Sequence, residues 1–491
     1  MIIEQLYDIY LRHPSIRTDT RQLKQGDLFF ALKGPNFNGN AFATRAFELG
    51  AAYAIIDEAP DQSSPDATLP PPASSDRLIV VPDVLSTLQE LALHHRRQFD
   101  IPFIAITGSN GKTTTKELIH AVLSLTYTTY TTQGNLNNHI GIPLTILSVG
   151  KDAQFAVIEM GANHQKEIEA YCRYTLPTHG IITNVGKAHL EGFGGPEGVK
   201  KGKGELYDFL RSAQVPAIGA GSPTASPAGT AFVLHDSADL LQMSRGIPHI
   251  ITYGTHDADV TGRIATSHQA AGGPSEALLK VDITRGAATG PIQTQLVGDY
   301  NLPNVLVAVA IGKHFGVPDT AIRQAIEQYA PSNSRSQMIE RNGLHIILDA
   351  YNANPSSMRA AIENFARLPI RGDAADPGQP TAQPARQAIP SDRRRPSDLG
   401  ASPTSKVLIL GAMAELGPES LAEHQGIIDL IGQYSWQQVV LVGGDFRHLS
   451  HPYLSFANSK EAGRWLAGVG LKDSYLLIKG SRSMKMEEVL G

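Results

Sequence analysis

The sequence has little cysteine, no long apolar run and no excess of basic charge. One cysteine, Cys172, among 491 residues excludes a disulfide framework and fits a reducing compartment. No uninterrupted apolar stretch approaches the about 20 residues that span a bilayer, and Glu4 and Asp8 stand where a signal peptide would be basic. The formal net charge of -5 argues against nucleic acid as the main partner. We therefore expect a cytoplasmic protein without membrane or nucleic-acid partners.

The length of the chain and its strand–helix alternation predict an α/β protein of several domains. A chain of 491 residues exceeds one hydrophobic core, and the 42% of hydrophobic residues is enough to build two or more cores. We place the boundaries at residues 1–98, 99–331 and 332–491. Residues 371–405 are rich in Pro, Ala, Arg and Ser, which predicts a disordered insertion.

The chain is organised around a glycine loop that follows a buried strand. The apolar run Ile101 to Ile106 leads into TGSNGKT, and a helical pattern follows. Strand, glycine loop and helix N-terminus together form the geometry that binds a polyphosphate. Gly108 and Gly111 let the backbone N–H groups face the phosphates, and Lys112 adds a positive charge. The spacing is shorter than that of the usual P-loop, because Ile106 stands where the first glycine is expected.

Polar residues follow the next two strands of the predicted parallel sheet. Glu159 ends one strand, and His189 lies shortly after another. Because ligands bind at the carboxyl ends of parallel strands, these residues are expected beside the loop. There Thr113, Glu159 and His189 could bridge Mg²⁺ to phosphate oxygens, although imidazole is a less usual Mg²⁺ ligand. The lysines around Lys203 either form a solvated basic face, or one of them is modified or lies near the phosphates.

Three further groups of polar residues each allow two interpretations from their residue types alone. The amides of Asn135, Asn137 and Asn138 suit substrate recognition or an ordinary turn. Thr20 and Arg21 could hold a phosphate or a sugar, or belong to a capped turn before a strand. The third group is Asn301 and Asn304, whose side chains either cap a helix or face the nucleotide base.

In the third unit, Asn342-Gly343 between two apolar runs predicts a tight hairpin turn.

These motifs together resemble the Mur ligases, the ATP-dependent amide-bond ligases of peptidoglycan synthesis. The family loop T-G-[ST]-x-G-K-T is matched by Thr107 to Thr113, which accounts for the short spacing. Other stretches are similar to the subgroup that adds D-alanyl-D-alanine, in its order: GNLNNHIGIP, EMGANHQKEI, NVGKAHLEGFGG, DAYNANPSSM, LGAMAELG and KGSRSMKME. The sequence departs from that pattern at Ala412, where relatives usually carry Asp, and in the insertion.

The resemblance implies a role for each matching residue. The ATP-binding set would be Thr107, Gly108, Ser109, Asn110, Gly111, Lys112, Thr113, Thr114, Asn301, Asn304, Arg335 and Asp349. The catalytic set would be Lys112, Glu159, His189 and Lys203. Thr113 and Glu159 would bind one Mg²⁺ and His189 a second, toward which a carbamate on Lys203 would bridge. The substrate-binding set would be Thr20 and Arg21, in a uridine-binding turn, with Asn135, Asn137, Asn138, Tyr351, Asn352 and Asn354.

The resemblance also implies the architecture and the reaction. The first domain would bind the UDP substrate, the second would be a parallel-sheet ATPase domain, and the third a Rossmann-like domain. A monomer would use ATP and Mg²⁺ to join D-alanyl-D-alanine to UDP-N-acetylmuramoyl-tripeptide through an acyl phosphate. Two alternatives stay open at this point: another Mur or folylpolyglutamate-type ligase, or a P-loop protein that binds nucleotide without catalysis.

Overall fold

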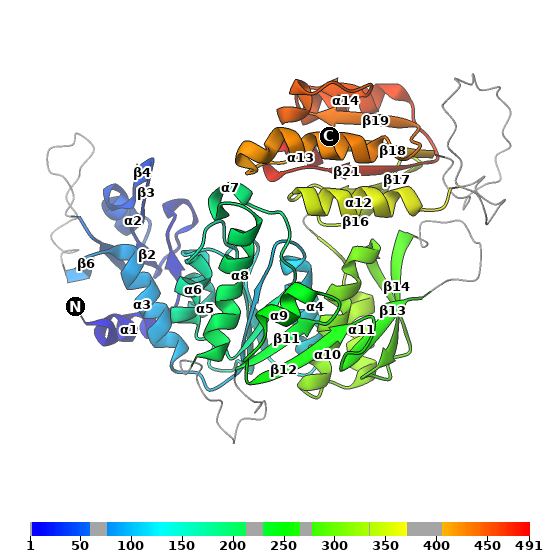
Figure 1. Cartoon of the computed structure of the whole chain (residues 1–491). Coiled ribbons are helices and arrows are strands. Elements are labelled where there is room, and N and C mark those ends of the chain that lie inside the picture. The colour runs from blue at the N-terminus through cyan, green and yellow to red at the C-terminus, as the bar shows by residue number, and fades with distance from the viewer. Residues whose placement is uncertain (1, 59–75, 213–228, 266–276, 333, 371–404) are drawn as a thin grey trace.

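The computed structural model contains three main β-sheets, which follow one another along the chain, and a two-stranded sheet within residues 33–38. Helices accompany the three main sheets, which confirms the predicted α/β fold class (Figure 1). It describes residues 2–58, 76–212, 229–265, 277–332, 334–370 and 405–491. The N-terminal sheet lies beside the central part, and the C-terminal sheet lies over the central part (Figure 1). The predicted insertion falls outside the described residues, except that Ser405 begins a strand. Within the described ranges, no helix combines the length and the hydropathy that crossing a bilayer requires.

The N-terminal part packs three helices against a small parallel sheet of order β1-β2-β5-β6. The apolar strand β2 is buried at every position, so that the sheet supplies much of the local core. The elements are α1 Ile3–Arg12, β1 Ile16–Arg17, β2 Leu28–Phe30, β3 Lys33–Gly34, β4 Phe37–Asn38, α2 Ala43–Glu48, β5 Tyr53–Ile56, β6 Leu78–Val80 and α3 Val84–Arg96.

The central part is built on a sheet of order β15-β14-β13-β12-β11-β10-β7-β9-β8. Its strands are β7 Phe103–Thr107, β8 Thr129–Thr131, β9 Phe155–Glu159, β10 His179–Ile182, β11 Thr230–Leu234, β12 His249–Gly254, β13 Val260–Ile264, β14 Leu278–Arg285 and β15 Pro291–Val297. Its helices are α4 Lys112–Ser124, α5 Gly141–Leu147, α6 Glu167–Thr175, α7 Leu190–Phe193, α8 Pro196–Arg211, α9 Ala238–Met243, α10 Leu302–His314 and α11 Asp319–Gln328. Strands β7, β9 and β10 pair in parallel, which aligns their carboxyl ends.

One edge of the central sheet departs from the parallel arrangement that we expected for this domain. Strand β14 runs antiparallel to both β13 and β15. The burial pattern gives the physical reason, because β15 alternates exposed and buried residues whereas β7 is buried throughout. Antiparallel strands can face water on one side, while parallel strands covered on both faces read as continuous apolar runs.

The C-terminal part is a sheet of order β16-β17-β21-β18-β19-β20 with helices on it. The predicted hairpin turn is confirmed: Asn342 and Gly343 have φ of 53° and 76°, as a type I′ turn requires, and Arg341 pairs with Leu344. The elements are β16 Gln337–Arg341, β17 Leu344–Asp349, α12 Pro355–Arg367, β18 Ser405–Gly411, α13 Ser420–Ile431, β19 Gln438–Val442, β20 Leu454–Phe456, α14 Ser459–Val469 and β21 Ser474–Lys479.

A buried arginine joins the N-terminal and central parts. Arg96, at the end of α3, is 2% exposed and donates hydrogen bonds to the carbonyl oxygens of Thr175, Leu176 and Phe99 at 2.8, 3.0 and 2.9 Å. Its guanidinium also stacks on the Phe103 ring at 3.8 Å. A buried charge is tolerated only when its donors are paired, so this set fixes α3 against the central sheet.

Candidate active site

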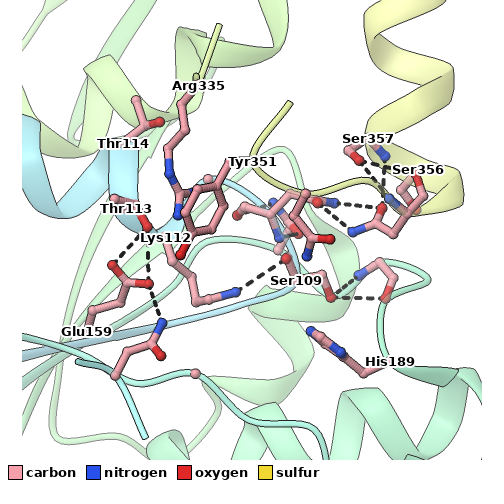
Figure 2. Close-up of a pocket in the computed structure, with 18 of the residues that line it drawn as sticks. Ser109, Lys112, Thr113, Thr114, Glu159, His189, Arg335, Tyr351, Ser356 and Ser357 are labelled. Atoms are coloured by element: carbon pink, nitrogen blue, oxygen red, sulfur yellow. Dashed lines mark hydrogen bonds between the residues drawn. The ribbon is translucent and has the colours of Figure 1, made fainter. Parts of the chain in front are cut away.

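A cavity of about 650 Å³ lies between the central and C-terminal parts, at the carboxyl ends of β7, β9 and β17. Most of the predicted site residues line it. They are Ser109, Asn110, Gly111, Lys112, Thr113, Thr114, Asn137, Asn138, Glu159, His189, Asn301, Asn304, Arg335, Asp349, Tyr351, Asn352 and Asn354. Residues from three separate strand ends and from two domains therefore share one cavity (Figure 2).

The loop after β7 requires its two glycines. Gly108 has φ of 139°, and a Cβ at this position would lie 2.0 Å from Thr183 Oγ1. Gly111 has φ of 79° and precedes α4 directly, where a Cβ would lie 2.8 Å from Asn304 Oδ1. Only glycine combines such backbone angles with such close neighbours. The short spacing thus gives a tight loop that ends at the N-terminus of a 13-residue helix, where backbone N–H groups can meet an anion.

Hydrogen bonds from the neighbouring strand end hold the loop in shape. Asn184 Oδ1 accepts from the Asn110 backbone N–H at 3.0 Å, and Ser109 Oγ donates to the Gly186 carbonyl at 2.9 Å. Thr183 Oγ1 donates to the Asn110 carbonyl at 2.6 Å. The residues that follow β10 therefore act as a template for the phosphate loop.

Lys112 folds back over the same loop. Its Nζ donates to the Gly108 carbonyl oxygen at 2.7 Å. It also donates to the Ser109 carbonyl oxygen at 3.3 Å (Figure 2). Burial lowers the pKa of Lys112, and the charge of Glu159 opposes that shift. The ammonium group consequently lies where it can exchange these carbonyl contacts for phosphate oxygens.

Thr113 and Glu159 form a pair suited to a hard cation. Thr113 Oγ1 lies 3.1 and 2.9 Å from the two oxygens of Glu159 (Figure 2). Asn137 Nδ2 donates to Glu159 Oε1 at 2.8 Å. Glu159 is 1% exposed, and a buried carboxylate favours a cationic partner. A hydroxyl and a carboxylate are oxygen donors of the kind that Mg²⁺ takes, so these residues fit the ion.

The other two predicted metal ligands are placed differently. His189 precedes α7 with φ of 52°, and its Nδ1 lies against a carboxylate oxygen of Glu415 from the C-terminal part. Lys203, on α8, is 1% exposed and does not line the cavity; its Nζ donates to the Ala162 carbonyl at 3.0 Å and lies 4.9 Å from the Phe193 ring centre. Burial, together with the charge of Lys112, lowers the pKa of Lys203 well below its ordinary value.

Asn301 and Asn304 were expected to cap α10 or to face a base. Asn301 makes no side-chain cap; its Nδ2 donates to the Val297 carbonyl at 2.8 Å. Asn304 Nδ2 donates to Asn301 Oδ1 at 2.9 Å, and Asn304 Oδ1 accepts from Thr115 at 3.0 Å. The capping interpretation of Asn301 is therefore wrong, and the chain of amides joins α10 to α4 beside the loop.

The C-terminal part contributes one wall of the cavity. The guanidinium of Arg335 lies 3.5 Å from the centre of the Tyr351 ring. Asp349 Oδ2 accepts from Lys479 Nζ at 2.6 Å. Asn354 caps α12 through a capping box and also donates to Asn110 Oδ1 at 2.7 Å, which ties this helix to the phosphate loop.

Five predicted residues besides Lys203 lie off the cavity lining. Thr107 and Gly108 form the base of the loop, and Thr107 Oγ1 donates to the Met160 carbonyl at 2.9 Å. Asn135 is exposed in the turn before Asn137. Thr20 and Arg21 belong to a 3₁₀ turn of the N-terminal part, where Arg21 pairs with Asp19 at 2.7 Å.

Sequence reasoning assigned no role to three residues that shape the site. Asn184 supports the loop, Glu415 approaches His189, and Lys479 pairs with Asp349. Each one lies inside a quoted motif, NVGKAHLEGFGG, LGAMAELG or KGSRSMKME, so the motifs gave the signal that could have found them. Among the described residues, a separate possible metal-binding group is His235, Asp236 and His256, and it contains none of the predicted ligands.

Known proteins resemble the chain along nearly its whole length. A model of the Mur ligase middle domain matches residues 106–312, and a model described as Mur ligase family, catalytic domain, matches residues 14–96. The UDP-N-acetylmuramoyl-tripeptide–D-alanyl-D-alanine ligase of Escherichia coli (strain K12) is 30% identical over 486 residues, which cover 97% of this chain and 92% of that protein. The chain belongs to the Mur ligase family.

Other Mur ligases agree in sequence and in structure. The ligase of the same name from Bacillus subtilis (strain 168) is 29% identical over 487 residues, with 97% of this chain and 92% of that protein covered. A crystal structure of MurF from Acinetobacter baumannii is 27% identical with a TM-score of 0.75, covering 97% of this chain and 92% of the other. The family resemblance read from the motifs is confirmed, and the chain is a ligase of this ATP-dependent family.

Proposed function

We propose that the protein joins D-alanyl-D-alanine to UDP-N-acetylmuramoyl-tripeptide with the hydrolysis energy of ATP, in the synthesis of peptidoglycan precursors. One observation carries this proposal: the phosphate loop and the Arg335–Asp349 wall face each other across one cavity. Relatives that match 97% of this chain carry the name of this reaction, which supports the choice of substrates. The six motifs beyond the loop also support it.

The reaction needs ATP because a carboxylate is a poor acyl donor. A carboxylate oxygen of the tripeptide attacks the γ-phosphorus, the bond to the β-phosphate oxygen breaks, and ADP leaves an acyl phosphate. The neutral amine of the dipeptide then attacks the acyl carbon, and phosphate leaves as the amide forms and the amine loses a proton. Positioning and charge stabilisation supply most of the catalysis in phosphoryl transfer.

The central residues would hold and activate the nucleotide. Lys112 and the loop N–H groups would bind the phosphates, together with the N-terminus of α4. Thr113 and Glu159 would hold Mg²⁺, and His189 would hold a second ion. When bound, Mg²⁺ neutralises charge on the transferring phosphoryl oxygens. Exclusion of water on closure would strengthen each of these interactions, because the local dielectric would fall.

Lys203 is proposed as the site of a carbamate that would complete the second metal site. Formation of a carbamate requires a neutral amine that attacks carbon dioxide and loses a proton. Burial, the main cause of the lowered pKa of Lys203, favours the neutral form of its amine. Its hydrogen bond to the carbonyl of Ala162, a residue that lines the cavity, supports this role.

The remaining assignments concern the two organic substrates. We propose that residues 1–98 bind the UDP end, through Thr20 and Arg21, and that residues 99–331 bind ATP. We propose that residues 332–491 close over the nucleotide, and that the amides of Asn137, Asn138, Asn352 and Asn354 contact the peptide substrates. The exposed Arg21 guanidinium is free to exchange Asp19 for a phosphate.

A phosphate-release assay with a set of amines tests the function. Purified protein with ATP, Mg²⁺ and UDP-N-acetylmuramoyl-tripeptide should release phosphate only when D-alanyl-D-alanine is added. Lys112→Ala should abolish the release, because the transferring phosphoryl group loses its cation, whereas the exposed Lys151→Ala should leave it unchanged. Turnover with D-glutamate or diaminopimelate in place of the dipeptide would move the protein to another member of the family.

A further inference from the structure

Arg335 enters the nucleotide cavity from an unusual stretch of backbone. Ser334 and Ser336, on either side of it, have φ of 56° and 47°, a left-handed conformation that residues other than glycine rarely adopt. Such strain persists only where the surrounding structure enforces it. Here the Ser334 carbonyl accepts from the backbone N–H groups of Ala350 and Tyr351 at 2.9 and 3.3 Å.

A second set of contacts ties the other side of the arginine. The backbone N–H of Ser336 donates to Asp349 Oδ1 at 3.3 Å, and Ser336 Oγ lies 3.0 Å from the Tyr300 hydroxyl. Asp349 is in turn held by Lys479 at 2.6 Å. The backbone on both sides of Arg335 is therefore fixed against the end of β17, and only the side chain still needs to be oriented.

The ring of Tyr351 provides that orientation. The guanidinium carbon of Arg335 lies 3.5 Å from the ring centre, and Arg482 lies 6.0 Å from the same ring. Arg335 and Tyr351 reach into the cavity on the side of Lys112 and Thr113 (Figure 2). Arg335 is close enough to Lys112 to contribute to lowering its pKa. Two cations directed at one place suit the phosphates of a nucleotide.

We infer that Tyr351 is a positioning residue, whose ring holds the Arg335 guanidinium ready for the phosphates of ATP, and not a residue that binds the peptide substrates. An unsupported arginine loses rotamer entropy when it is fixed. A guanidinium already stacked on a ring has lost most of that freedom, and a preorganised charge costs no reorganisation during the reaction. This inference rests on the proposed ATP-dependent ligation.

The test uses the intact protein and separates the ring from the hydroxyl. Tyr351→Ala should lower kcat/KM for ATP by roughly 2- to 30-fold, the range to which cation–π energies of about 0.5 to 2 kcal/mol convert. Tyr351→Phe keeps the ring and should retain the activity. The KM values for the UDP substrate and the dipeptide should stay unchanged in both variants. Tyr434→Ala, a half-exposed tyrosine of the same domain outside the cavity, is the matched control.

A double-mutant cycle decides whether Tyr351 acts through Arg335. In an Arg335→Ala background, Tyr351→Ala should cause no further loss, because the group that it orients is gone. Equal losses in both backgrounds would overturn the inference, as would a Tyr351→Phe variant as impaired as Tyr351→Ala or a rise confined to the dipeptide KM. Thermal unfolding of each variant identifies any loss caused by misfolding.

Direct binding separates this inference from the proposed function. Calorimetric titration with ATP measures the effect of Tyr351→Ala even if D-alanyl-D-alanine is not the acceptor. An unchanged ATP affinity and unchanged kcat/KM for ATP in Tyr351→Ala would overturn the inference alone. Absence of phosphate release from the wild type with D-alanyl-D-alanine would overturn only the proposed function.

Discussion

The substitution Gly108→Ala would damage the phosphate loop from inside. The added Cβ would lie 2.0 Å from Thr183 Oγ1, 3.0 Å from the Thr183 backbone nitrogen and 3.1 Å from that of Asn184. An alanine held at the φ of 139° is strained by about 1 to 3 kcal/mol. Overpacking around the added Cβ costs about 1 to 3 kcal/mol more. We expect the free energy of unfolding to fall by roughly 2 to 6 kcal/mol, with loss of phosphate release.

Urea unfolding and phosphate release measure the two effects on the same preparation. Gly468→Ala is the control, because a Cβ there meets no atom within 4 Å and the glycine lies in α14; alanine in a helix should stabilise by about 0.5 to 1 kcal/mol. Adding Thr183→Ala to Gly108→Ala removes the closest atom and should restore part of the stability, because the backbone contacts remain. A Gly108→Ala variant that unfolds like the wild type and retains full activity would refute the reasoning.

Three further predictions concern single charged or titratable side chains. Glu159→Gln should slow phosphate release by roughly 100-fold or more, because a metal ion contributes several kcal/mol, whereas Glu169→Gln, in a surface ion pair, should not. Arg96→Met should lower the free energy of unfolding by roughly 3 kcal/mol, because three carbonyls, one buried and two half-buried, lose their donor; the exposed Arg97→Met should change it little. Burial lowers the pKa of His179 from 6.5 to about 3. The unfolded chain therefore binds the extra proton first, so this contribution to stability is present above pH 6.5 and is lost as the pH falls toward 3. Urea unfolding at several pH values should show a loss of about 2 kcal/mol between pH 6.5 and about 5, and His179→Gln should reduce that slope; an unchanged slope would contradict the assignment.

Local patterns in the sequence predicted those features that neighbouring residues determine. The Asn342-Gly343 hairpin turn follows from backbone preferences at two positions, and the structure has it. The glycine loop and the strand before it follow from a short apolar run and from residues that permit positive φ. The antiparallel edge was missed, although the alternation of Ile292, Thr294 and Leu296 with polar residues in β15 carried its signal.

The sequence by itself determined the α/β class, the phosphate loop and the set of polar residues at the strand ends, because periodicity and loop chemistry act over a few residues. Only the tertiary structure decided which of those residues meet. Asn110 and Asn354 are 244 positions apart and share a hydrogen bond, and Tyr351 supports Arg335 across a left-handed turn. Such contacts depend on how separate domains pack and on which side chains become buried, and no local sequence pattern encodes domain packing or burial. Burial also keeps Lys203 off the cavity surface.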